Sequence, residues 1–189
     1  LLQSDYARAD ILPEGDPRIL AQSVPVPGVE GLTGYLVHPA SGGPRFPAVL
    51  VIHENRGLNP HIRDVTRRMA AEGFLALGLD YLSPMGGTPA DEDKGREMIG
   101  RLDPEAVIAS GRAAVAFLKG HPQSTGAVGA IGFCWGGGAV NVLATREPDL
   151  RAGVAYYGRQ APAQDVPKIR AALMLHYAGL DERINAGIP

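Results

Sequence analysis

The sequence has little of several features that would assign a protein to a class at once. Of its 189 residues one is a cysteine and 6% are aromatic, and the formal net charge is −2. A single cysteine excludes a disulfide within the chain and CxxC metal spacing. A pI near 6.2 with interspersed charges argues against nucleic acid or an anionic membrane surface as a partner. No apolar run approaches the roughly 20 residues that span a bilayer.

What remains is enough for one globular domain. Hydrophobic residues make up 45% of the chain and charged residues 20%, and no low-complexity tract interrupts it. The chain begins Leu1-Leu2-Gln3-Ser4, without methionine or the regions of a signal peptide, which indicates that something upstream was removed. Localisation therefore stays open, as does a homo-oligomer, because a sequence alone gives no interface. We expect no cofactor and no metal.

The order of the elements predicts an α/β fold. Residues 1–31, rich in Pro, Gly, Asp and Ser, suggest an N-terminal arm on the surface, in which residues 24–29 pair as an edge strand in a hairpin with residues 32–37. Residues 32–189 would form the domain, a mostly parallel sheet with helices on both faces. Strands are expected at residues 47–52, 74–79, 127–133, 151–157 and 172–177. Helices are expected from Asn59-Pro60 to Gly73, over residues 91–102 and 104–119, and from the end of the strand at 127–133 to about residue 146.

The only cysteine, Cys134, lies where the strand at residues 127–133 gives way to a helix. Gly132 and Gly136 stand two positions to either side of it. That is the frame of a nucleophile elbow, whose tight strand-to-helix turn has no room for side chains at those two positions. The alternative, a cysteine serving as a small buried hydrophobe, does not account for both glycines.

Other polar residues follow the strands, at the edge where ligands bind in such sheets. A thiol at a helix N-terminus is favoured as the thiolate, and acyl transfer then needs donors for the developing oxyanion. We expect the backbone N–H groups of Trp135 and Asn55 to supply them. The bland alternative for residues 53–55 is a solvated strand exit.

Three segments together carry a family resemblance: VIHENRGLN at residues 51–59, GFCWGG at 132–137 and GLDERI at 179–184. The chain from about Gly34 onward resembles the dienelactone hydrolases (carboxymethylenebutenolidases) among the α/β-hydrolases. The resemblance implies a Cys-His-Asp triad with Cys134 as nucleophile and Asp181 as the acid, and implies that Glu54 helps to form the thiolate. A carboxylate beside a thiol opposes its ionisation electrostatically, so Glu54 makes sense as a proton acceptor. Asp181 could otherwise be part of an acidic turn.

The chain departs from the family pattern at the triad histidine. None of its five histidines follows Asp181; they are His38, His53, His61, His121 and His176. The simplest interpretation is a chain that is truncated before a further strand, the histidine loop and a helix. Apolar surface along residues 173–175 would then be exposed unless another chain covers it.

The substrate pattern departs as well. The family implies an arginine in the loop after residue 80, where this chain has Tyr81 and no arginine. Tyr81, Arg56 and Arg159 are the candidate substrate-binding residues, and the two arginines could hold an anion. The expected function is hydrolysis of a small-molecule ester or lactone through a thioester. The alternative is a non-catalytic binding or assembly form of the fold without its base; a thiol redox protein is disfavoured because no resolving cysteine exists.

Overall fold

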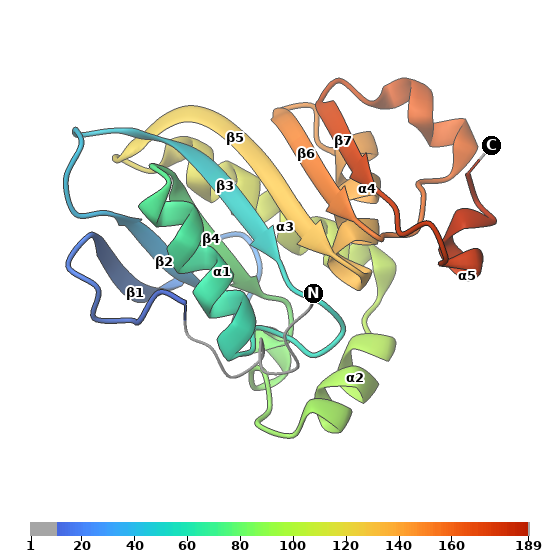
Figure 1. The fold of residues 1–189 in the computed structure, drawn as a ribbon, viewed down its shortest axis with the longest axis horizontal. Helices are drawn as coiled ribbons and strands as arrows, with labels where there is room; N and C mark the ends of the chain where they lie inside the picture. Colours follow the sequence, from blue (N-terminus) through green and yellow to red (C-terminus); the bar gives the residue numbers. More distant parts are fainter. Residues whose placement is uncertain (1–10, 189) are drawn as a thin grey trace.

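The computed structural model describes residues 11–188, in which seven strands form one twisted sheet (Figure 1). Their order across the sheet is β1-β2-β4-β3-β5-β6-β7. Strands β1 and β2 pair antiparallel with each other, β2 is antiparallel to β4, and all remaining pairs are parallel. The strands are β1 Ile19–Pro25, β2 Thr33–Pro39, β3 Phe46–Ile52, β4 Leu75–Asp80, β5 Ser124–Phe133, β6 Leu150–Tyr156 and β7 Ala172–His176.

Helices cover both faces of the sheet, as the predicted α/β fold requires (Figure 1). Helix α1 packs against β2 and β4, whereas α3 and α4 pack on the opposite face against β5 and its neighbours. Helix α2 lies beyond the carboxyl ends of the strands. The α-helices are α1 Pro60–Ala71, α2 Glu92–Gly100, α3 Pro104–Gly120, α4 Trp135–Arg146 and α5 Glu182–Asn185, and 3₁₀ turns occupy Ser83–Met85 and Ala163–Lys168.

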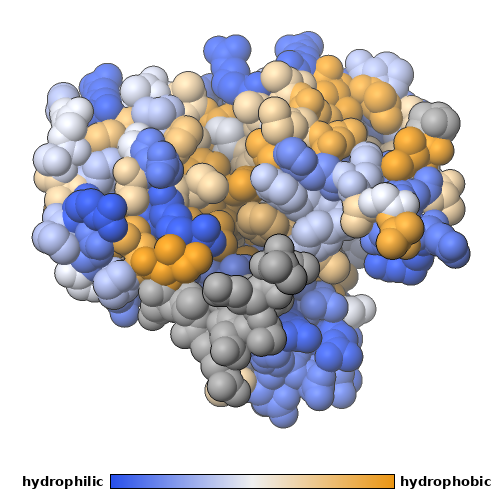
Figure 2. Space-filling view, viewed as in Figure 1, coloured by the Kyte–Doolittle hydropathy of each residue, from blue (hydrophilic) through white to orange (hydrophobic). Residues whose placement is uncertain are grey.

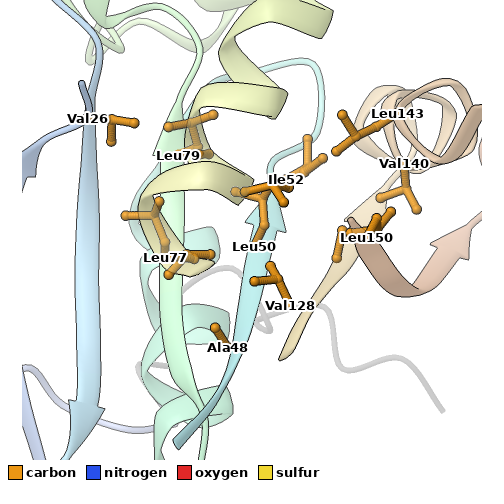
Figure 3. Close-up of a cluster of buried hydrophobic side chains, with 14 of the residues drawn as sticks. Val26, Ala48, Leu50, Ile52, Leu77, Leu79, Val128, Val140, Leu143 and Leu150 are labelled. Carbon is orange, nitrogen blue, oxygen red and sulfur yellow. The ribbon is translucent and has the colours of Figure 1, made fainter. Parts of the chain in front are cut away.

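Strand β3 shows why the sequence adopts this arrangement. Successive side chains of a strand point to opposite faces, so Val49 and Val51 enter the core under α1, while Leu50 and Ile52 enter the core under α3 and α4 (Figure 3). A continuous apolar run therefore suits a strand that is buried on both faces. All of these residues except Val49 are completely inaccessible to solvent, and Val49 is nearly so.

The helices begin where short polar residues can cap them. Asn59 accepts a hydrogen bond from the Ile62 amide at 3.1 Å, and Asp103 accepts one from the Ala106 amide at 3.0 Å. In both helices the first residue is a proline, whose missing N–H is no loss at that position. The helix boundaries predicted from Asn59-Pro60 and from residue 104 are confirmed.

The antiparallel hairpin is confirmed, but its first strand begins earlier than residues 24–29. Strand β1 is Ile19–Pro25, and residues 26–31 form turns. Pro25 and Pro27 cannot donate ladder hydrogen bonds, and Gly28 has φ 103°, so the chain leaves the sheet there. Leu12 is also buried, and its N–H donates to Asp64 Oδ1 at 2.8 Å. Residues 11–31 thus contribute to the sheet and its cover; residues 1–10 of the expected arm lie outside the described residues.

The opposite edge of the sheet is open. In β7, Met174 is 58% exposed and Leu175 is 46% exposed, while Leu173 packs partly against the core. Figure 2 shows hydrophobic residues on the surface over β6 and β7. The exposure expected for residues 173–175 is confirmed at Met174 and Leu175. Within residues 11–188, no helix has the length and apolarity that crossing a bilayer demands.

Candidate active site

A cavity of about 630 Å³ opens beyond the carboxyl ends of the central strands. Polar residues from four successive strand ends line it. Asn55 follows β3, Tyr81 follows β4, Cys134 follows β5, and Tyr157 and Arg159 follow β6. The rule that ligands bind at this edge of a parallel sheet thus singles out the right positions.

Cys134 occupies a strained turn between β5 and α4. Its backbone has φ 54° and ψ −115°, and only Cys134 and Tyr157 among the described non-glycine residues have positive φ. The Cys134 N–H donates to the Tyr156 carbonyl at 3.0 Å, while the Cys134 carbonyl accepts from the Gly138 N–H at 3.1 Å. Strain held by surrounding hydrogen bonds in this way is typical of a functional site.

The glycines around Cys134 are required by close approach of the backbone. A Cβ on Gly132 would collide with the Gly136 carbonyl, and a Cβ on Gly136 would lie 2.5 Å from the Ile52 carbonyl oxygen. Real Cβ atoms do not come that close to backbone atoms. The spacing therefore reflects the tight elbow that the sequence predicts.

The two predicted oxyanion donors line the cavity beside Cys134. Trp135 is the first residue of α4, and the first N–H groups of an α-helix have no partner within the helix. Asn55 belongs to the loop after β3 and lines the same cavity. Their positions suit a pair of backbone donors, one from the elbow and one from an earlier strand.

Glu54 is held by a tyrosine that the sequence analysis passed over. The Tyr157 hydroxyl donates to Glu54 Oε1 at 3.0 Å, and the Tyr157 backbone N–H donates to the His176 carbonyl at 2.7 Å. Tyr157 has φ 40°, and its ring lines the cavity. Its position directly after β6 is the sequence signal that points to it, because ligands bind at the carboxyl ends of such strands. Glu54 itself is half-buried and is not a lining residue.

An aromatic cluster that includes Tyr81 and Trp135 forms part of the cavity wall. The buried His53 ring stacks on Trp135 with centroids 5.3 Å apart and meets Tyr81 edge-on at 5.4 Å. His53 Nδ1 lies 2.6 Å from the Glu54 carbonyl oxygen, which can only accept, so Nδ1 carries the proton. Nε2 is then a buried acceptor without a partner. Burial lowers the pKa of His53, and burial likewise raises the pKa of Tyr81.

The two candidate arginines differ in their surroundings. Arg159 lines the cavity, and within residues 11–188 its guanidinium has no ion pair. Arg56 is not a lining residue, because its Nη1 lies 2.5 Å from Glu92 Oε2 on α2. Arg183, which the sequence analysis did not select, lines the cavity from α5. An anion in the cavity would thus meet Arg159 and Arg183 before Arg56.

Asp181 lies at the start of α5, where its Oδ1 accepts a hydrogen bond from the Ile184 amide at 3.1 Å. It is not among the residues that line the cavity, and neither is any histidine of the described chain. His176 is exposed on β7 and stacks on Tyr156 at 4.4 Å. The structure thus gathers Cys134, Trp135, Asn55, Tyr81 and Arg159 around one cavity and leaves Asp181 outside it. Residues 11–188 contain no group of three potential metal ligands.

A seven-stranded, mostly parallel sheet with helices on both faces and a nucleophile elbow after a central strand defines the α/β-hydrolase fold. The model of the dienelactone hydrolase family matches residues 32–188, and the chain belongs to that family. The resemblance drawn from the three sequence segments is thereby confirmed.

The relatives agree with this assignment. A putative hydrolase fragment of Escherichia coli, YghX, is 48% identical over 55% of this chain and 92% of its own length. A putative carboxymethylenebutenolidase of Methylorubrum extorquens is 33% identical over 88% of this chain, which spans 62% of that protein. The crystal structure of a dienelactone hydrolase from Anabaena variabilis is 26% identical, with a TM-score of 0.71 over 89% of this chain and 78% of that one.

Proposed function

We propose that the protein hydrolyses carboxylic ester or lactone bonds of small molecules with Cys134 as the nucleophile. The observation that carries the proposal is the strained thiol residue at the head of α4, in the wall of a cavity lined by Asn55, Trp135 and Tyr157. The name of the Methylorubrum relative, a putative carboxymethylenebutenolidase, supports the choice of ester and lactone bonds.

In the first step the Cys134 thiol gives its proton to Glu54, and Sγ attacks the carbonyl carbon of the substrate. The carbonyl π electrons move to oxygen, and the oxyanion accepts hydrogen bonds from the Trp135 and Asn55 N–H groups. The oxyanion then reforms the carbonyl, the carbon–oxygen bond to the leaving group breaks, and the Glu54 carboxyl gives its proton to the alcohol oxygen. A thioester remains on Cys134. In a lactone the leaving alcohol stays attached to the acyl part.

In the second step Glu54 takes a proton from a water molecule as the water oxygen adds to the thioester carbon. The carbon–sulfur bond then breaks, and Glu54 gives the proton to Sγ, which releases the acid and restores the thiol. Tyr157 supports Glu54 in both steps, because its donated hydrogen bond fixes one carboxylate oxygen and leaves the other for the proton. We assign Asp181 the role of triad acid on the family resemblance. Its side chain then has to orient a histidine, and the cavity wall of the described residues contains none. Arg159 is the cation that we assign to an anionic group of the substrate.

The test is the hydrolysis of p-nitrophenyl acetate by the protein and by Cys134→Ala. We expect the substitution to lower kcat/KM at least about a thousandfold, because no second nucleophile replaces the thiol. Since the chain has one cysteine, iodoacetamide modifies that site alone and should abolish turnover in parallel. The variant's far-UV circular dichroism and unfolding midpoint should match those of the parent. Turnover that survives both treatments would contradict the proposal.

A second candidate is a binding form of the fold that retains the cavity without turnover. The observation that favours it is the lack of a histidine in the cavity wall of residues 11–188. It predicts that esters bind, seen as a change in the fluorescence of the single tryptophan, Trp135, while product release stays at the uncatalysed rate. Measured turnover that depends on Cys134 would exclude it.

A further inference from the structure

The cavity has two walls of different chemistry. The polar wall holds Cys134, Asn55 and Tyr157 at the strand ends. The second wall is apolar and comes from α2, α3, α4 and the turn between α2 and α3. Its members are Ile99, Leu102, Val107, Ile108, Val142 and Leu143. An ester carbonyl needs only the polar wall, so the apolar wall has no part in the chemistry proposed above.

A glycine in the middle of α3 keeps this part of the cavity open. Gly111 is buried and lines the cavity, and a Cβ there would lie 3.2 Å from Leu143 Cδ1 and 3.3 Å from the Tyr81 hydroxyl. Glycine in a helix interior is less stable than alanine, so its presence calls for a local reason. Even one methyl group at residue 111 would push Leu143 or Tyr81, both of which also line the cavity.

The size and lining of the cavity fit a larger ligand than a compact lactone. About 630 Å³ is in the range of pockets that enclose ligands of drug size, and such pockets are mostly apolar with a few polar groups that fix orientation. Here the polar groups are gathered at Cys134, and Arg159 and Arg183 add positive charge to the lining. A ligand with a polar, reactive end and an apolar arm would match both walls.

We propose that the substrate is an ester or a lactone with a flexible apolar arm. The arm lies between α3 and α4 against Val107 and Leu143. This inference rests on the proposed function for the chemistry, but the arm site itself is a property of the cavity. Gly111 is the specificity-determining residue, because it sets the space that is open to the arm.

The kinetic test compares p-nitrophenyl esters from acetate to octanoate, together with methyl to octyl acetates for an arm on the alcohol side. In one of the two series we expect kcat/KM to rise by up to about fourfold for each methylene that enters the cavity, mostly through KM. Gly111→Ala should remove most of that gain. Gly120→Ala on the same helix is the matched control, because a Cβ there meets nothing within 4 Å, and it should keep the gain.

Val107→Thr supplies a second variant that keeps the shape of the side chain and makes the wall polar. It should reduce the gain with chain length even if Gly111→Ala does not fold. A flat response to chain length in both ester series would overturn the arm site while leaving the hydrolase intact. A gain that Gly111→Ala and Val107→Thr both preserve would also overturn it.

A binding test separates this inference from the proposed function. Trp135 is the only tryptophan and lines the cavity, so its fluorescence reports occupancy without turnover. In Cys134→Ala, sodium octanoate should change the signal at a concentration at least about fiftyfold lower than sodium acetate, since six more methylenes are buried. Equal half-saturation by the two acids overturns the arm site. Preferential octanoate binding by a protein that hydrolyses no ester supports the site and contradicts the function.

Discussion

Strands β3 and β7 belong to the same sheet, yet their surroundings differ at nearly every residue. Six of the seven residues of β3 are buried, whereas four of the five residues of β7 are exposed. The loops that follow differ in the same way. Asn55 after β3 lines the cavity, whereas Asp181, after β7, caps the four-residue helix α5 and does not line the cavity. Packing therefore holds the side of the cavity at Cys134 and Asn55 far more firmly than the segment around Asp181.

The largest effect should come from placing a side chain inside the tight turn at Cys134. Gly136→Val places side-chain carbons against the Ile52 and His53 carbonyls, so the turn cannot keep its shape. We expect a loss of activity of more than about a thousandfold and a loss of several kcal/mol in the free energy of unfolding, of the order of a core defect. Urea unfolding and ester hydrolysis check both. Gly179→Val near β7, where a Cβ meets nothing within 4 Å, is the control, and an equal loss there would contradict the comparison.

The next largest effect is the loss of stability when a leucine is truncated in β3 and, for comparison, in β7. Leu50→Ala removes a completely buried side chain and should lower the free energy of unfolding by about 3–5 kcal/mol. Leu175→Ala removes a side chain that is 46% exposed and should cost less than about 1 kcal/mol. Urea unfolding of the two variants side by side gives both numbers. Similar losses would show that the β7 edge is covered in solution.

A smaller effect follows from the buried histidine next to the central strand. Burial lowers the pKa of His53 in the folded protein. Below the usual pKa of 6.5, His53 is therefore protonated in the unfolded chain but stays neutral in the folded one. Stability is therefore greatest above pH 6.5 and falls with decreasing pH, by at most about 1.4 kcal/mol per pH unit for one group. His53→Gln should flatten this slope between pH 6.5 and 5.

Because burial also lowers the pKa of His121, that residue contributes a slope of the same sign. His121→Gln is the matched control, and it should remove less of the slope since His121 is more exposed. An unchanged slope in His53→Gln would show that the ring is not kept neutral in the folded protein. Urea midpoints across the pH range provide the measurement.

The smallest effect is expected at α5. Asp181→Ala removes the cap on the Ile184 amide and should cost about 1 kcal/mol or less, while Asp181→Asn keeps an accepting oxygen and should cost a few tenths. Activity separates the two roles of the residue. If Asp181 serves as the triad acid, Asp181→Asn lowers kcat although the hydrogen bond to the Ile184 amide survives. Equal kcat in the Asp181→Asn variant and the parent protein would leave capping of α5 as the only role of Asp181.

The sequence predicted the centre of the molecule well because several signals agree there. The apolar run at residues 47–52, the Asn59-Pro60 helix start and the glycines around Cys134 each demand one local structure, and that structure is found. The edges were harder. The sequence predicts the first strand too late, because Val24, Val26 and Val29 are typical of a strand, while the intervening prolines and Gly28 determine the backbone.

Site geometry could be predicted only where it is set by chain neighbours. Cys134 and Trp135 are adjacent to the elbow, so their placement follows from the motif. The contacts of Glu54 with Tyr157 and of Arg56 with Glu92 join residues far apart in the sequence, and no local pattern encodes them. Asp181 is predicted as the triad acid from a short segment, and the sequence does not specify which residues surround that segment in three dimensions.

Tyr157 has one more consequence, for the way the protein loses function on heating. Its side chain holds Glu54, and its backbone N–H is bonded to His176 at the end of the exposed strand β7. Edge elements open at lower free energy than the core of a sheet. Local opening of β7 would release Tyr157 and, through it, the Glu54 carboxylate, to which we assign the proton of the thiol. Activity should therefore decline some degrees below the midpoint of global unfolding, as a sub-global melting that far-UV circular dichroism scarcely registers.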